Sequence, residues 1–143
     1  VKSMTYSRYL VGTVTNELRG ITREVTIDTD LTITEINDGD GVFTVNGTRV
    51  NTVHVDRNNG SYTGDWTVTK TFQDIQSTRT IEGNTRTHTY VGSMDVVFNG
   101  TFIGPRGERT VNESAEVQLN GTRTVTVTMD GETTTFEITH TQN

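Results

Sequence analysis

Residues 117–139 read VQLNGTRTVTVTMDGETTTFEIT, and the alternation in this stretch decides the fold. Apolar residues fall at every second position of 125–129 and again at 136 and 138, with threonine or charged residues between them. This period of two is that of a β-strand with one buried face and one solvent face. Asn-Gly and Asp-Gly separate the runs, and both are strong hairpin signals. The stretch therefore predicts three antiparallel strands.

The two turns of this stretch predict different loop lengths. At the Asp-Gly turn, a two-residue loop pairs Val125 with Phe136 on one face. At the Asn-Gly turn, a two-residue loop would set Val125 opposite a glutamate, whereas a three-residue loop through Thr122 sets it opposite Val117. Since a one-residue slip turns every side chain to the other face, we expect the longer loop, with Gly121 left-handed.

Length and composition extend this pattern to the whole chain. The 143 residues predict one domain, 1–143. Only 30% of the residues are hydrophobic, and about a fifth are threonine. Low hydrophobicity also fits disorder, but disordered chains are poor in the β-branched residues that are abundant here. We expect an all-β antiparallel meander of about eight to ten long hairpin-connected strands, forming a sandwich or an open barrel with a thin core.

Other turn signals predict where these strands begin and end. Asn46-Gly47 predicts a hairpin that pairs Phe43 with Val50. The apolar parity changes between Val50 and Val53, which predicts a bulge or bend near residue 51. Further expected features are a bulge at Gly12, a connection at 73–76, a hairpin at 83–84 and a turn at 104–107.

One four-residue word occurs twice. Residues 46–49 and 120–123 both read Asn-Gly-Thr-Arg, and an Asp-containing turn follows each. The repeat suggests an internal duplication with halves of about 1–75 and 76–143. The alternative is that a threonine-rich chain with many hairpins repeats such words by chance.

Charge and motifs exclude several classes of function. The net charge of −6 argues against nucleic acid or an anionic membrane as a partner, and the two signs alternate along the strands as on a solvated face. No apolar run approaches the roughly 18 residues that a membrane-spanning helix needs. The chain has no cysteine, so disulfides and thiolate metal sites are excluded. It has no hydrolase elbow, zinc-protease motif or P-loop, so we expect that it is not an enzyme.

Two segments are candidate binding sites. The acidic turn at 37–41 offers Asp38 and Asp40 as hard oxygen ligands that suit calcium, although the same residues are usual in a plain turn. The segment 60–66 offers Tyr62, Asp65 and Trp66, which could stack on and hydrogen-bond a sugar. The alternative for Trp66 is an anchor in the core. The histidines at 54, 88 and 140 lie on separate strands and are expected on solvent faces.

The alternating strands, rich in Thr, Arg and Asn-Gly, resemble those of secreted or lipid-anchored β proteins of the Bacteroidota-type cell envelope. This resemblance lies in the texture of the whole chain and assigns no site residue. It implies a secreted or cell-envelope location, a lipidated cysteine upstream of residue 1, and a protein or glycan partner at the cell surface.

We therefore expect a non-enzymatic binding or structural domain of the cell envelope. The alternative is a barrel-like protein that binds a small lipid or carbohydrate, and a hydrolase is third. The large side chains Phe43, Trp66, Phe72, Phe98 and Phe102 discriminate between the first two. A filled core favours the first function, and a cavity favours the second.

Overall fold

The computed structural model describes residues 2–35, 42–122 and 124–137, which form one antiparallel sheet of eight strands. The strands are β1 (Lys2–Asn16), β2 (Ile21–Glu35), β3 (Phe43–Arg57), β4 (Tyr62–Glu82), β5 (Thr85–Gly104), β6 (Gly107–Asn120), β7 (Thr124–Met129) and β8 (Glu132–Glu137). A short 3-10 turn, η1 (Glu17–Arg19), joins β1 to β2. The predicted all-β antiparallel meander is confirmed.

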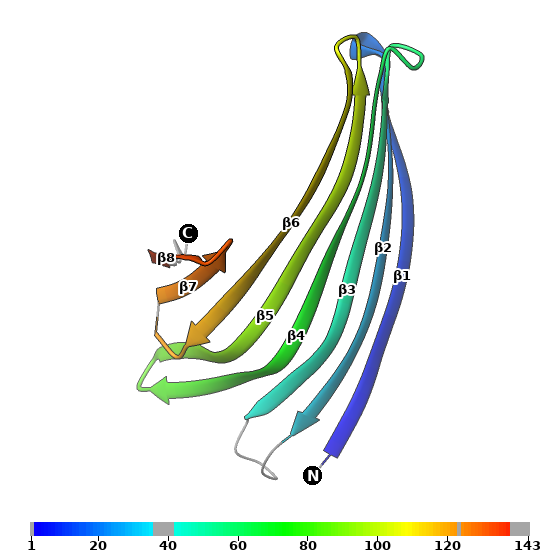
Figure 1. Ribbon diagram of the computed structural model, residues 1–143. Helices are drawn as coiled ribbons and strands as arrows, with labels where there is room; N and C mark the ends of the chain where they lie inside the picture. Colours follow the sequence, from blue (N-terminus) through cyan, green and yellow to red (C-terminus); the bar gives the residue numbers. More distant parts are fainter. Residues whose placement is uncertain (1, 36–41, 123, 138–143) are drawn as a thin grey trace.

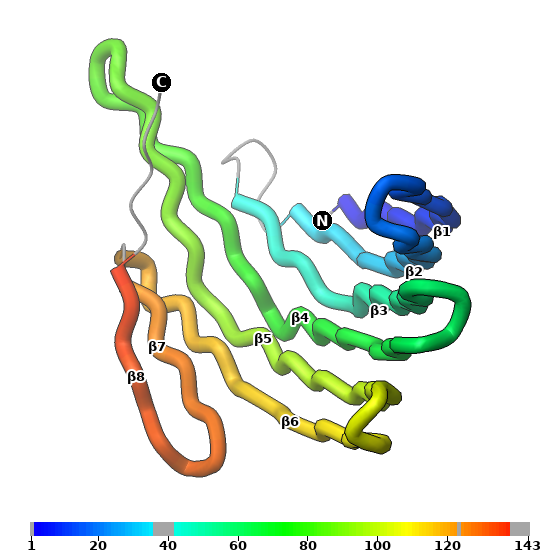
Figure 2. Tube along the Cα trace, turned by 90° about the horizontal axis from the view of Figure 1, so that it is seen from above, coloured from blue at the N-terminus to red at the C-terminus, as the bar shows by residue number. Residues whose placement is uncertain are grey.

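Each strand pairs with its neighbours in sequence, so the order in the sheet is the order in the chain (Figure 1). Seen from above, the sheet is curved, and its two ends do not meet (Figure 2). β1 and β8 are therefore open edges, and the sheet is not closed into a barrel. The described residues also form no second sheet, so the sandwich alternative is wrong.

One face of the sheet is apolar. Residues directly opposite each other in an antiparallel pair project from the same face. The register places Tyr6, Leu31, Gly47, Phe72 and Met94 opposite one another from β1 to β5. We call the face that carries this row the apolar face. The other discriminating side chains also project from it, namely Phe43, Trp66, Phe98 and Phe102.

The opposite face is dominated by threonine, and we call it the threonine face. Thr26, Thr52 and Thr67 lie directly opposite one another on it, in β2, β3 and β4. Among the described residues, no hydrophobic side chain is buried on either face. The predicted thin core is therefore wrong, because a core needs a second layer and this sheet has none in the described ranges.

The predicted hairpin at Asn46-Gly47 is also wrong. β3 runs through it, with a register shift between Val45 and Gly47. Gly47 has a φ of 135°, and a Cβ there would lie 2.1 Å from the carbonyl oxygen of Asp30. Asn46 Nδ2 donates to Asp74 Oδ1 (3.0 Å), and the Asp74 backbone N–H donates to Asn46 Oδ1 (2.8 Å). From Val45 to Gly47, β3 spans two residues where β4 spans three, Phe72 to Ile75, so the extra residue of this bulge lies in β4 and Asn46 braces it.

The bulge of β4 lies at 73–76, where a connection was predicted. β4 instead continues through this segment, with a register shift against β5 between Gln73 and Gln76. The expected bulges at Gly12 and Asn51 are absent, since both residues pair regularly within described strands. The change of apolar parity after Val50 means only that Val50 projects from the threonine face.

The short turns follow their predicted chemistry. Asp130 and Gly131 have φ of 53° and 79°, as a two-residue turn of type I′ requires. Val125 lies opposite Phe136, as predicted. The expected hairpin at 83–84 and turn at 104–107 are also confirmed.

The other predicted turn is correct in its faces but not in its register. Gly121 is left-handed, with a φ of 78°. Val125 lies opposite Leu119 rather than Val117, a shift of two residues that keeps the apolar face. Thr122 N–H and hydroxyl both donate to the Asn120 side-chain oxygen, and Gly121 N–H donates to a β5 carbonyl. These bonds hold Asn120 at the end of β6, so the loop begins one residue later than predicted.

Candidate functional site

Charge is sorted between the two faces of the sheet. In the described strands, every lysine and arginine projects from the apolar face, which the register alone establishes. These residues are Lys2, Arg8, Arg23, Arg49, Arg57, Lys70, Arg79, Arg86 and Arg109.

Most acidic residues project from the opposite face. The regularly paired acids of the threonine face are Glu24, Asp28, Asp30, Asp56, Asp65, Glu82, Asp95, Glu108, Glu116 and Glu137. The apolar face carries Glu35, Glu113 and Glu132. The net charge of −6 therefore combines a cationic apolar face with an anionic threonine face.

A row of cations crosses the middle of the apolar face. Arg8 lies opposite Thr29, which lies opposite Arg49, and Arg49 lies opposite Lys70. Like charges directly opposite each other destabilise a sheet. Within the described part of the chain, no carboxylate forms an ion pair with Arg8, Arg49 or Lys70. We call these three residues the cationic row.

The cationic row borders a hollow of about 190 Å³ on the apolar face. Gly47 has no side chain, and its neighbours across the sheet, Leu31 and Phe72, both line the hollow. The full lining is Tyr6, Arg8, Leu10, Ile27, Thr29, Leu31, Arg49 and Phe72. An apolar wall and two guanidinium groups thus meet at one place.

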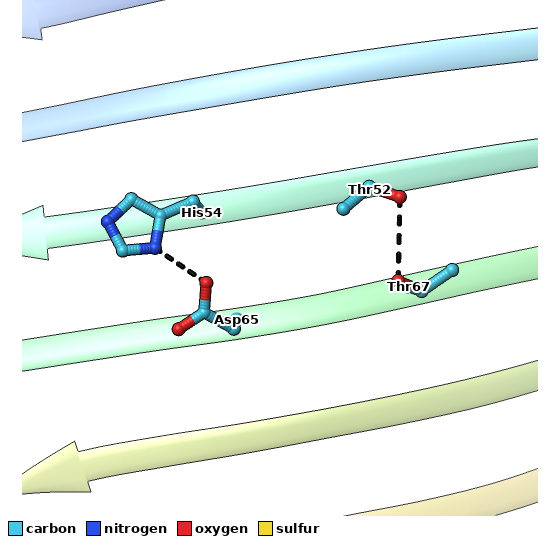
Figure 3. A network of polar contacts seen from close by, with 4 residues as sticks. All are labelled: Thr52, His54, Asp65 and Thr67. Carbon is cyan, nitrogen blue, oxygen red and sulfur yellow. Dashed lines mark hydrogen bonds and ion pairs between the residues drawn. The ribbon is translucent and has the colours of Figure 1, made fainter.

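The threonine face has a polar hollow of about 370 Å³ near the η1 end of the sheet, lined in part by Glu24, His54 and Asp56. His54 Nδ1 lies 2.6 Å from Asp65 Oδ1 across β3 and β4, beside the Thr52–Thr67 hydroxyl contact (Figure 3).

The hydrogen bond to Asp65 raises the pKa of His54. Desolvation of the ring opposes this shift, and the charges of Asp65, Glu24 and Asp56 raise the pKa further. His54 and Asp65 are 42% and 64% exposed, so water screens the pair. In the described ranges, no three His, Asp or Glu side chains are placed to hold a metal ion.

The structure separates the predicted sugar-binding residues. Tyr62 and Trp66 project from the apolar face, whereas Asp65 projects from the threonine face and bonds His54. Trp66 stacks on Phe102 with ring centroids 5.9 Å apart. Carbohydrate binding by Tyr62 and Trp66 stays a prediction, without Asp65 beside them.

The predicted calcium ligands, Asp38 and Asp40, lie outside the described residues, as does His140. His88 lies opposite Arg79, on the apolar face rather than on a threonine-rich one. Sequence reasoning missed the His54–Asp65 pair. The turn at 58–61 could have predicted this pair. It sets Arg57 opposite Tyr62, and three residues further along each strand His54 lies opposite Asp65.

No family model, curated protein or solved structure matches the chain. No helix in the described ranges is long and apolar enough to cross a membrane. Function has to be inferred from the two faces of the sheet.

Proposed function

We propose that the protein is a non-enzymatic binding domain whose apolar face binds an apolar ligand or partner. One observation carries this proposal. A sheet with one apolar face normally buries that face against a second layer, and no described hydrophobic side chain here is buried. Large contiguous apolar patches on a protein surface usually mark interaction sites.

The energy available to an occupant is comparable with the stability of a domain. Met4, Tyr6 and Leu10 of β1 are 57%, 40% and 40% exposed. Burying a fully exposed side chain of this kind is worth roughly 1.5–3 kcal/mol, so covering the exposed half of one is worth about 1 kcal/mol. Roughly five to ten of them would reach the roughly 5–15 kcal/mol by which native domains are stable. We therefore expect an occupant to stabilise the folded chain.

A secreted or cell-envelope location fits this proposal. It is supported by the resemblance of the threonine-rich strands to those of envelope β proteins. In that setting the candidate occupants are a lipid, a glycan or a surface protein. The hollow beside the cationic row favours a small ligand over an extended partner, because it lies within the apolar face.

The neutral dye Nile red tests the proposal with a pair of neighbouring substitutions. Phe72 and Thr71 follow each other in β4 and project from opposite faces. Phe72→Ser should lower the blue-shifted emission of the bound dye by about half or more, because it removes apolar surface from the hollow. Thr71→Ser should leave the emission unchanged. Equal emission from both variants and the parent would contradict binding at the apolar face.

A further inference from the structure

We propose that the cationic row binds the anionic head group of a long-chain amphiphile, a carboxylate or a phosphate, while the alkyl chain lies along the hollow. This inference rests on the proposed function and names the class of ligand.

The charges of the cationic row favour an anion between its side chains. Arg49 and Lys70 are directly opposite each other, and Arg8 lies two strands from Arg49, about 10 Å between backbones. Arg49 Nε donates to Asn51 Oδ1 at 3.3 Å, which leaves the cation unneutralised. Among the described residues, the row has no ion-pair partner. An anion between these side chains would convert mutual repulsion into charge-assisted hydrogen bonds.

Apolar side chains flank the cationic row on each side. The next row on this face lies two residues further along each strand, and in one direction it contains Tyr6, Leu31 and Phe72. In the other direction it contains Leu10, Ile27, Asn51 and Val68. An amphiphile with its head on the row would have apolar wall available for its chain in either direction.

The position of the row also selects between a single amphiphile and a bilayer. Side chains that enter a bilayer keep their cations at the rim, where they reach the head groups. The cationic row lies between apolar rows, so docking this face on acyl chains would bury its charges in hydrocarbon, which is unfavourable. A single molecule brings its own anion to the centre of the face.

A second copy of the chain is a poorer occupant for the same reason. Two apolar faces packed against each other would bring two cationic surfaces together, since every strand lysine and arginine in the described chain lies on that face. Like-charge contacts across an interface disfavour association.

The experiment is isothermal titration of the full chain with amphiphiles that share a twelve-carbon tail, each below its micelle concentration. The probes are dodecyl phosphate, dodecyl maltoside and, without a tail, inorganic phosphate. Dodecyl phosphate should bind with one molecule per chain and at least about tenfold more tightly than the other two, as charge-assisted hydrogen bonds imply. Its affinity should fall with added salt, whereas that of dodecyl maltoside should not.

Two matched double variants place the site. R49Q/K70Q removes charge from the row and should lower the affinity for dodecyl phosphate about tenfold, with no effect on dodecyl maltoside. R79Q/R86Q removes the same charge from the outer part of the β4–β5 hairpin, which extends beyond the rest of the sheet (Figure 2). This control should bind like the parent. The salt dependence of the parent still decides the question if R49Q/K70Q does not fold.

The other outcomes overturn the inference in distinguishable ways. Equal binding of dodecyl phosphate and dodecyl maltoside would refute the anion site and leave the apolar binding function standing. Binding to vesicles of anionic phospholipid, but not to dodecyl phosphate, would show that the face docks on a membrane. A dimer whose formation blocks all probes would identify a second copy as the occupant. Failure of every amphiphile, together with failure to bind Nile red, would refute the proposed function as well.

Discussion

Replacing Gly47 with alanine tests its close approach to the β2 backbone, opposite the bulge of β4. A Cβ at this position would lie 2.1 Å from the Asp30 carbonyl oxygen and 2.9 Å from Leu31 Cα, so the β2 and β3 backbones would have to separate by about 1 Å. A φ of 135° adds backbone strain of roughly 1–3 kcal/mol. Each ladder hydrogen bond weakened nearby costs about 1 kcal/mol. We expect a loss of about 3 kcal/mol.

Gly12 is the matched control, because it also lies on the apolar face and a Cβ there would meet no atom within 4 Å. Gly12→Ala should change stability by less than about 1 kcal/mol and in the stabilising direction. In thermal melts followed by circular dichroism, Gly47→Ala should melt about 10 °C below the parent. If the two variants melt within about 2 °C of each other, Gly47 does not lie against the β2 backbone.

Further outcomes concern polar contacts and one turn. A double-mutant cycle between Asn46→Ala and Asp74→Ala should give a coupling of about 1 kcal/mol in urea unfolding, and no coupling would contradict the brace between β3 and the bulge of β4. Asp65→Asn should lower the raised pKa of His54 in an NMR titration. The stabilisation from this pair is complete below the ordinary histidine pKa of 6.5 and is lost as pH rises through the raised value, so Asp65→Asn should flatten that dependence. Gly131→Ala should cost about 1 kcal/mol in urea unfolding, and an unchanged midpoint would rule out the left-handed turn.

The strand faces could be predicted from the sequence where the determinants are local. The pairing of Val125 with Phe136 follows from the period of two and from a turn whose chemistry lies in two adjacent residues. Asn46-Gly47 carries the same kind of signal but lies within β3, opposite the bulge of β4. Its deciding partner, Asp74, is 28 residues away, and no local pattern indicates that contact.

The candidate site depends still more on long-range register. Arg8, Arg49 and Lys70 come from three strands, and only the pairing of β1 to β4 brings them into one row. The sequence does hold a signal. Arg8 falls in phase with Tyr6 and Leu10, and Lys70 falls in phase with Val68 and Phe72. Cations that alternate in phase with apolar residues predict a cationic apolar face. This signal is easily overlooked because positive and negative residues are mixed along each strand.

Gly47 lies beside both the bulge of β4 and the proposed binding site. Its close approach to the β2 backbone excludes a side chain, and its neighbours across the sheet, Leu31 and Phe72, line the hollow beside Arg49. The bulge of β4 directly follows Phe72, and bulges near functional sites are common. Gly47→Ala forces the β2 backbone away beside Leu31 and should therefore weaken binding of dodecyl phosphate more than Gly131→Ala, where a Cβ would meet no atom within 4 Å. Equal binding by those two variants would show that the ligand site does not depend on the close contact of Gly47 with β2.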